Sequence, residues 1–203
     1  VPEKVIGYGM TLARRALGAY SPLEARRTLE TVLEFIGSSS PDSPSIEAEA
    51  RDLLARALWT AGLRGPALDE YHRAIAGFRA AADPAREMTS IASAAEAAWA
   101  ARFADTSAML VDRGLELSRE SVAAGDSENP ANEVVVSNLA RLLKLGATIA
   151  NLRGEFELAA QRLDERERLL AFDASSRIEV DRGATLRIAV PPTIRARHPI
   201  QCR

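Results

Sequence analysis

Two stretches of this chain match each other when the sequence is shifted by 40 residues. ARALWTAGLRGPALDEYHRAI begins at Ala55, and AEAAWAARFADTSAMLVDRGL begins at Ala95. Small residues align with small ones and large apolar residues with large ones, and Trp59 aligns with Trp99. A unit of this length buries its apolar face only by stacking on neighbouring units. The repeat therefore constrains the fold more strongly than any single motif.

The same pattern extends in both directions and defines four units. Each unit carries one small residue in its first half, and a second small residue, four positions before a large one, in its second half. The first-half residues are Ala13, Ala55, Ala95 and Ala147. The second-half residues are Ala25, Ala67, Ser107 and Ala159, separated by 42, 40 and 52 residues. A small and a large residue at i, i+4 share one face of a helix. We therefore expect helix pairs at 3–18/22–36, 46–61/66–82, 86–101/105–122 and 133–152/156–171.

Segments rich in helix-breaking residues separate these pairs. GSSSPDSPS (37–45), AADP (81–84) and AAGDSENPAN (123–132) have the composition of loops. Within the pairs, Pro66 and Pro22 stand where a new helix starts, a position that tolerates proline, and Ser21 can cap the second helix of the first pair. We interpret the serine-rich 37–45 segment as a loop.

These features resemble the tetratricopeptide-repeat (TPR) family. GEFELAAQRL (154–163) follows its order of glycine, acidic residue, aromatic, alanine and large apolar residue, and GLRGPALDEYHRAI (62–75) is similar. The chain departs from the family in its longer period, in tryptophans near the end of the first helix, and in Ser107 and Arg166 where alanine is usual. The resemblance covers about residues 3–171. It implies an all-α, right-handed superhelix of about four TPR-like hairpins, with a short β-like C-terminal tail.

The resemblance also implies a binding groove lined by the first helix of each hairpin. The matching positions are Arg14, Arg56, Trp59, Glu96, Trp99, Lys144, Thr148 and Asn151. Arginine and lysine can hold carboxylates, Asn151 can bond a peptide backbone, and indoles offer flat apolar contact. The alternative is that both tryptophans fill seams between hairpins and that Arg56 and Glu96 belong to surface ion pairs.

No catalytic or cofactor-binding motif is present in the sequence. It has no phosphate-binding loop ending in Gly-Lys-Ser/Thr and no nucleophile elbow. His72 and His198 belong to different segments, and Cys202 is the one cysteine, so converging metal ligands are not expected. We expect a protein that is not an enzyme and has no cofactor or metal.

Charge and hydropathy exclude two classes of partner. The net charge of −2, without basic clusters that contain aromatics, gives no support for nucleic-acid binding. No apolar run approaches the roughly 20 residues that span a bilayer, so no membrane insertion is expected. The N-terminus lacks the pattern of a signal peptide, and we expect a cytoplasmic protein.

The pattern changes after Ala171. SSRIEV (175–180) and ATLRIAV (184–190) are short β-branched runs separated by DRG, which predicts a hairpin or an extended tail. We therefore divide the chain into 1–171, a TPR-like α-solenoid, and 172–203, a tail or the start of a second domain. GATLRIAVPPTIRARHPIQ resembles the opening of family 5 extracellular solute-binding domains, which bind peptides and nickel, and about equally the effector domain of LysR-type regulators.

We expect a non-catalytic scaffold that binds a protein or peptide partner. Lys4 and Lys144 are the only lysines among 26 basic residues, a bias of high-GC bacterial genomes. The chain starts at Val1, so we expect it to be the helical segment of a larger bacterial regulatory or signalling protein. The alternatives are a helical module fused to a peptide-type solute-binding domain that begins near Gly183, and an enzyme whose catalytic domain lies outside this sequence. The sequence does not indicate the partner or the oligomeric state.

Overall fold

The computed structural model describes residues 2–39, 44–123 and 131–183, and these residues form eight α-helices and no strand. The helices are α1 (Pro2–Gly18), α2 (Pro22–Ser39), α3 (Pro44–Thr60), α4 (Arg64–Ala80), α5 (Pro84–Ala100), α6 (Ala104–Ala123), α7 (Ala131–Leu152) and α8 (Phe156–Gly183). They pair into four hairpins within these ranges. The predicted all-α superhelix of TPR-like hairpins is confirmed, and most helix ends fall within two or three residues of their predicted positions.

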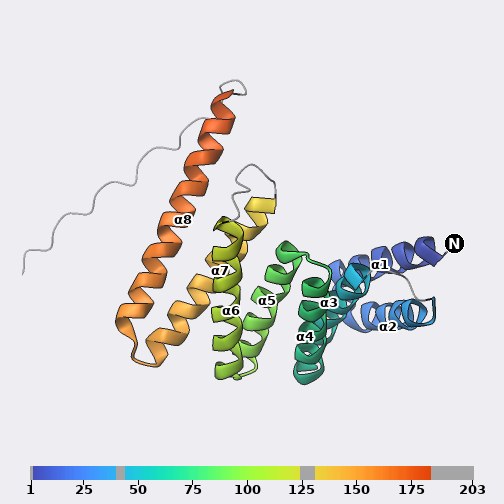
Figure 1. The fold of residues 1–203 in the computed structure, drawn as a ribbon. Coiled ribbons are helices and arrows are strands. Elements are labelled where there is room, and N and C mark those ends of the chain that lie inside the picture. The colour runs from blue at the N-terminus through green and yellow to red at the C-terminus, as the bar shows by residue number, and fades with distance from the viewer. Residues whose placement is uncertain (1, 40–43, 124–130, 184–203) are drawn as a thin grey trace, which may run out of the picture.

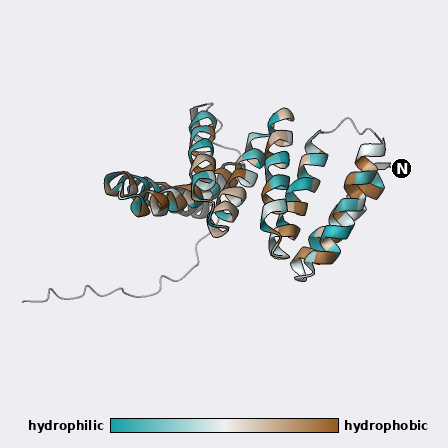
Figure 2. Cartoon of the chain, turned by 90° about the horizontal axis from the view of Figure 1, so that it is seen from below, coloured by the Kyte–Doolittle hydropathy of each residue, from teal (hydrophilic) through white to brown (hydrophobic). Residues whose placement is uncertain are grey.

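The hairpins stack in a row from α1 and α2 at one end to α8 at the other (Figure 1). Each second helix packs both on its own partner and on the first helix of the next hairpin, as α2 does on α3, α4 on α5 and α6 on α7. Hydrophobic and hydrophilic residues alternate along the helices (Figure 2). Amphipathic helices of this kind leave each hairpin with an apolar side that only a neighbouring hairpin covers.

The repeated small residues lie where the two helices of each hairpin cross. All eight of them are buried, in the first helices Ala13, Ala55, Ala95 and Ala147 and in the second helices Ala25, Ala67, Ser107 and Ala159. Ser107, which replaces the usual alanine, donates a hydrogen bond from its hydroxyl to the Ala95 carbonyl at 2.9 Å. A hydroxyl is therefore accommodated at the crossing because the opposing backbone carbonyl accepts its hydrogen bond.

Two hydrophobic clusters make up most of the core. One includes Leu29 and Leu54 and joins the first two hairpins, and the other includes Ile91 and Leu142 and extends from α3 to α7. Trp59, near the end of α3, is half-buried and packs against both clusters. This indole therefore connects the two halves of the core.

The turn inside each hairpin has the same geometry. A residue with positive φ ends each turn, namely Tyr20 at 55°, Gly62 at 81°, Arg102 at 68° and Gly154 at 78°. The amide of each donates to the carbonyl three residues back, and the next amide donates to the carbonyl five residues before it, which closes the end of the first helix. These positions are separated by 42, 40 and 52 residues, the spacing predicted from the small residues.

The C-terminal expectation needs a correction. The predicted first strand, 175–180, lies inside α8, which continues to Gly183. Gly183 is the first glycine or proline after Gly154, and extending an existing helix by a residue adds a hydrogen bond, whereas a two-stranded hairpin without a sheet is marginal in water. The predicted second strand and nearly all of the segment that resembles a solute-binding domain lie outside the described residues. In the described part of the chain, no helix is both long and apolar enough to cross a membrane.

Replacing Trp59 by alanine tests its role in joining the two clusters. Because the indole is half-buried, we expect the free energy of unfolding to fall by about 2 kcal/mol, less than for a fully buried tryptophan. Loss of the shared contact also separates the halves of the array, so thermal unfolding followed by circular dichroism should broaden or split. A single transition of unchanged steepness would show that other contacts couple the hairpins.

The turns give a second prediction. Substitutions at two equivalent turn positions should change the free energy of unfolding in opposite directions. Gly62→Ala introduces a Cβ that meets no atom within 4 Å, so only the left-handed backbone is penalised, at about 1 kcal/mol. Arg102→Gly relieves the same strain at an exposed position and should stabilise the protein by about 0.5 kcal/mol, after allowing for the added freedom of the unfolded chain. Urea titrations of both variants measure these changes, and a stabilising Gly62→Ala would contradict the assigned geometry.

Candidate partner-binding face

Polar side chains bridge the first helices of successive hairpins. We call the surface formed by α1, α3, α5 and α7 the first-helix face. Between α1 and α3, Arg14 forms an ion pair with Glu49. Between α5 and α7, Arg141 holds Glu96 through two hydrogen bonds, from Nε to Oε1 at 2.9 Å and from Nη2 to Oε2 at 2.6 Å. A guanidinium bound to both oxygens of a carboxylate is the strongest such arrangement.

The bridge between α3 and α5 is built differently. Ser90 donates its hydroxyl to Asp52 Oδ1 at 2.5 Å, and Arg86 Nη1 lies 3.4 Å from Glu49 Oε2. Further along the same seam no charged bridge joins α3 to α5 among the described residues. The backbones of α5 and α7 approach closely, whereas those of α3 and α5 do so much less. This wider seam leaves space for a pocket.

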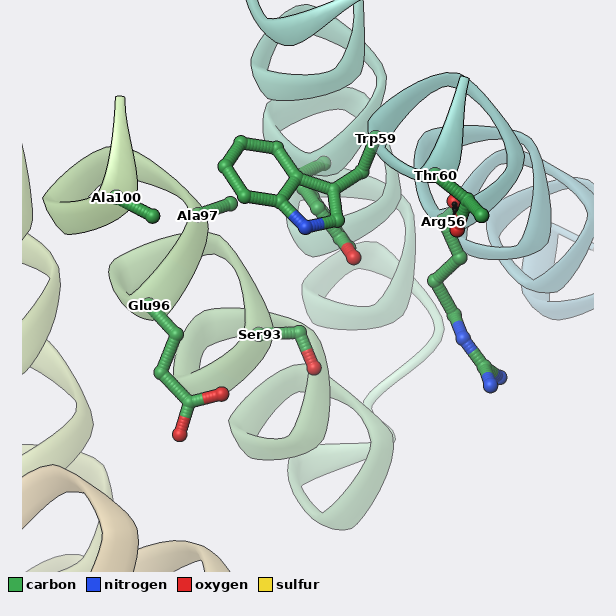
Figure 3. A pocket seen from close by; sticks show the side chains of 8 residues that line it. Arg56, Trp59, Thr60, Ser93, Glu96, Ala97 and Ala100 are labelled. Atoms are coloured by element: carbon green, nitrogen blue, oxygen red, sulfur yellow. Dashed lines mark hydrogen bonds between the residues drawn. The ribbon is translucent and has the colours of Figure 1, made fainter. Parts of the chain in front are cut away.

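A pocket of about 360 Å³ opens between α3 and α5. Its lining residues are Arg56, Trp59 and Thr60 from α3, Tyr71 from α4, and Ser93, Glu96, Ala97 and Ala100 from α5. The indole of Trp59 extends across the gap toward α5 and lies over Ala97 (Figure 3). Arg56 and Glu96 lie at opposite sides of the opening (Figure 3). The pocket thus combines an apolar wall with a polar rim.

Arg56 and Glu96 do not neutralise each other. Both oxygens of Glu96 are held by Arg141, so its charge is already balanced. Arg56 forms no ion pair with any residue that the structure describes, and it acts on Asp52 only at longer range, where its charge lowers the pKa of that carboxyl. The alternative to ligand binding was a surface ion pair for each residue. Glu96 forms one with Arg141, and Arg56 forms none among the described residues.

The pocket is rich in hydrogen-bond donors. The indole N–H of Trp59 and the hydroxyls of Tyr71 and Ser93 have no acceptor among the described residues. Burial raises the pKa of Tyr71, so its hydroxyl stays protonated and can donate. Thr60 instead donates to the Arg56 carbonyl at 2.8 Å. A ligand that supplies acceptors would satisfy this surplus of donors.

The two tryptophans have different surroundings. Trp59 lines the pocket, and the Arg64 guanidinium lies 5.8 Å from its ring centroid. Arg64 also donates to the Ala100 carbonyl at 3.4 Å, which places it beside the same seam. Trp99 is half-buried against the core cluster that contains Ile91 and does not line the pocket. These contacts favour packing as the role of Trp99.

The remaining predicted groove residues lie away from the pocket. Lys144, Thr148 and Asn151 are exposed on α7, and the Thr148 hydroxyl donates to the Lys144 carbonyl at 3.0 Å. Arg14 is exposed on α1 and engaged by Glu49. The structure therefore brings Arg56, Trp59 and Glu96 together, while the other five predicted residues are distributed along the first-helix face or its seams.

Sequence reasoning missed the polar residues that complete the α3–α5 seam. Asp52 and Ser93 lie about one helical turn from predicted positions, and Ser90 lies one turn before Ser93. Tyr71 is the large residue four positions after Ala67, which the repeat predicts to pack within the hairpin. Tyr71 is buried, as expected, yet it lines the pocket. A signal was available, because positions 52, 56 and 59 of α3 and 93, 96 and 100 of α5 follow the i, i+3, i+4 rule for one helix face. No cluster of potential metal ligands is found among the described residues.

Comparison with known proteins shows the fold. No protein-family model matches the sequence, and no curated protein matches it. The crystal structure of BtubC (BKLC) from P. vanneervenii is similar, with a TM-score of 0.73 at 13% identity, and the match covers 98% of this chain and 73% of that one. Two crystal structures of a Podosopora anserina putative kinesin light chain with nearly identical TPR-like repeats match with a TM-score of 0.53 at 16% identity. They cover 86% and 85% of this chain and 98% of their own. This chain thus has the fold of a TPR-like repeat array.

The Asp52–Ser90 bridge leads to a prediction about pH. Burial raises the pKa of Asp52, an effect that the Ser90 hydrogen bond and Arg56 reduce and that Glu49 reinforces. A carboxyl whose pKa is higher in the folded state favours folding when it is protonated, so its contribution declines as pH rises above its ordinary value of about 3.9. Asp52→Asn keeps the shape without the charge and should raise the melting temperature at pH 7. The gain should shrink toward pH 4, and a gain that is constant with pH would contradict the assignment.

Proposed function

We propose that this chain is a non-catalytic scaffold that binds a protein or peptide partner along its first-helix face. Several observations support the proposal. The fold is a TPR-like repeat array, and arrays of this kind present an extended concave surface to partners. The observation that carries the proposal is the pocket at the α3–α5 seam, which has an apolar wall and donors that no described residue satisfies. Sites that bind a ligand combine these two features.

The other parts of the first-helix face suit an extended partner. Lys144, Thr148 and Asn151 add a cation and two polar groups on α7, and Arg14 lies on α1, so polar side chains flank the pocket on both sides. These groups are exposed and can rearrange toward a peptide at little cost in burial. An extended chain that crosses successive first helices would meet the pocket near its middle.

A regulatory or signalling role in a larger bacterial protein fits this arrangement. We infer that the array recruits a partner and that any chemistry belongs to the partner or to another part of the same protein. A cytoplasmic location remains part of this proposal.

Selection from a random peptide library tests the proposal. We expect the wild-type chain to enrich peptides that the double variant Arg56→Ala, Lys144→Ala binds at least about tenfold more weakly, because each cation contributes a charge-assisted contact. Binding is measured by fluorescence anisotropy with labelled peptides from the selection.

The matched control removes two arginines from the second helices. Arg73 on α4 and Arg119 on α6 are exposed, and their change to alanine should leave the affinity unchanged. Equal losses in the two double variants would indicate a general effect of positive charge. Failure to enrich any peptide that depends on the first-helix face would reject the scaffold proposal.

A further inference from the structure

Equivalent positions along the first-helix face show an interruption in the charge pairing. The residue after the small crossing residue is Arg14 in the first hairpin, Arg56 in the second, Glu96 in the third and Thr148 in the fourth. Two of the three charged members are neutralised across the seam to the next hairpin, Arg14 by Glu49 and Glu96 by Arg141. Arg56 has no such counterpart in the described part of the chain.

The cause lies in the residues that α5 places opposite Arg56. Glu49, the counterion of Arg14, lies seven residues before Arg56, the equivalent position in the next hairpin. Arg141, the counterion of Glu96, likewise lies seven residues before Thr148. The corresponding position on α5 is Thr89, followed by Ser90 and Ser93. Thr89 accepts a hydrogen bond from Asn138, and Ser90 donates to Asp52, so neither supplies a carboxylate to Arg56. Small residues on α5, namely Ser93, Ala97 and Ala100, also leave the space that forms the pocket.

We propose that a carboxylate from the partner occupies this vacant pairing position, and that it is the side chain of a glutamate in an extended peptide. The inference rests on the proposed function, since it names the chemistry that the first-helix face recognises. A glutamate matches both halves of the pocket. Its methylenes lie against the Trp59 indole, Ala97 and Ala100, and its oxygens accept hydrogen bonds from Arg56.

The neighbouring donors add to this match. Tyr71, Ser93 and the Trp59 N–H offer neutral hydrogen bonds that an anion can accept. Glu96 does not repel the incoming carboxylate strongly, because Arg141 already holds both of its oxygens. A side chain rather than a chain terminus fits because polar first-helix surface continues on both sides of the pocket, toward Arg14 and toward Lys144. A peptide that ends in the pocket would leave one of these sides unused.

The chain contains two tryptophans, of which Trp59 supplies an NMR signal at the pocket and Trp99 an internal reference. Their indole N–H signals are separately observable in a ¹⁵N-correlated NMR spectrum, and Trp99→Phe assigns them. The probe is N-acetyl-glutamate N-methylamide, which carries one carboxylate on its side chain and no charge at its ends. We expect it to shift the Trp59 signal in a saturable way and to leave the Trp99 signal in place. The glutamine analogue should produce no saturable shift.

Two variants separate Arg56 from a general charge effect. Arg56→Gln should weaken binding of the glutamate probe about tenfold or more, as expected for the loss of a charge-assisted hydrogen-bonded pair. Arg119→Gln, at an exposed position on α6 outside the first-helix face, should leave the binding unchanged. An unshifted Trp99 signal and an unchanged circular dichroism spectrum show that both variants remain folded.

Several outcomes overturn the inference. Equal shifts from the glutamate and glutamine probes would show that no carboxylate is recognised. A stronger effect from N-acetyl-alanine, whose carboxylate is terminal, would assign the pocket to a chain terminus instead. Unchanged binding to Arg56→Gln would remove the proposed counterion. These results are independent of the peptide selection, since peptides without acidic residues could still bind the first-helix face, and a probe could bind where no peptide is selected.

Discussion

Close approach of the two helices at small residues is the contact on which the whole array depends. Each hairpin has an alanine, or once a serine, on both sides of its crossing, and all of these residues are buried. A larger side chain at Ala55 or Ala67 would separate α3 from α4 and displace the hairpins stacked on either side. Protein interiors are packed too densely to absorb such a change locally. At Ser107 the single added oxygen is accommodated because it bonds directly to the opposing Ala95 carbonyl.

Once the hairpins have formed, the surface of the first helices follows from how they stack. Side chains that point away from the crossing meet those of the next first helix, and their charges determine whether the seam closes or stays open. Arg141 and Glu96 close the seam between α5 and α7. Between α3 and α5, the side chains of Ser93, Ala97 and Ala100 are too short to fill the same space, which the Trp59 indole lines. The pocket thus results from a few small residues on α5 in an otherwise regular array.

The fold was largely predictable from the sequence because its repeat is local. The spacing of small residues identified four hairpins, and the turns at Gly62 and Arg102 fall at the same spacing. The predicted groove residues were less complete. Arg56, Trp59 and Glu96 meet at one pocket, as the shared helix face suggests. The ion pairs were not predicted, because Glu49, the partner of Arg14, and Arg141, the partner of Glu96, each come from the next hairpin. Which residue faces which across a seam depends on the twist between hairpins, and the period within one hairpin contains no information about that twist.

The predicted strand at 175–180 was wrong for a related reason, because short β-branched runs indicate strands only where a partner strand exists. Residues 175–180 extend α8 instead, since no described strand is available to pair with them.

Trp59 links the stability of the array to the pocket. It packs against both hydrophobic clusters and also lines the space where a ligand would sit. A ligand that covers the exposed part of the indole would add contacts at a residue that packs against both clusters. Whatever binds only the folded array stabilises it by mass action, and here the gain is located at the seam between the halves. The same indole therefore contributes both to the packing of the core and to the wall of the proposed binding pocket.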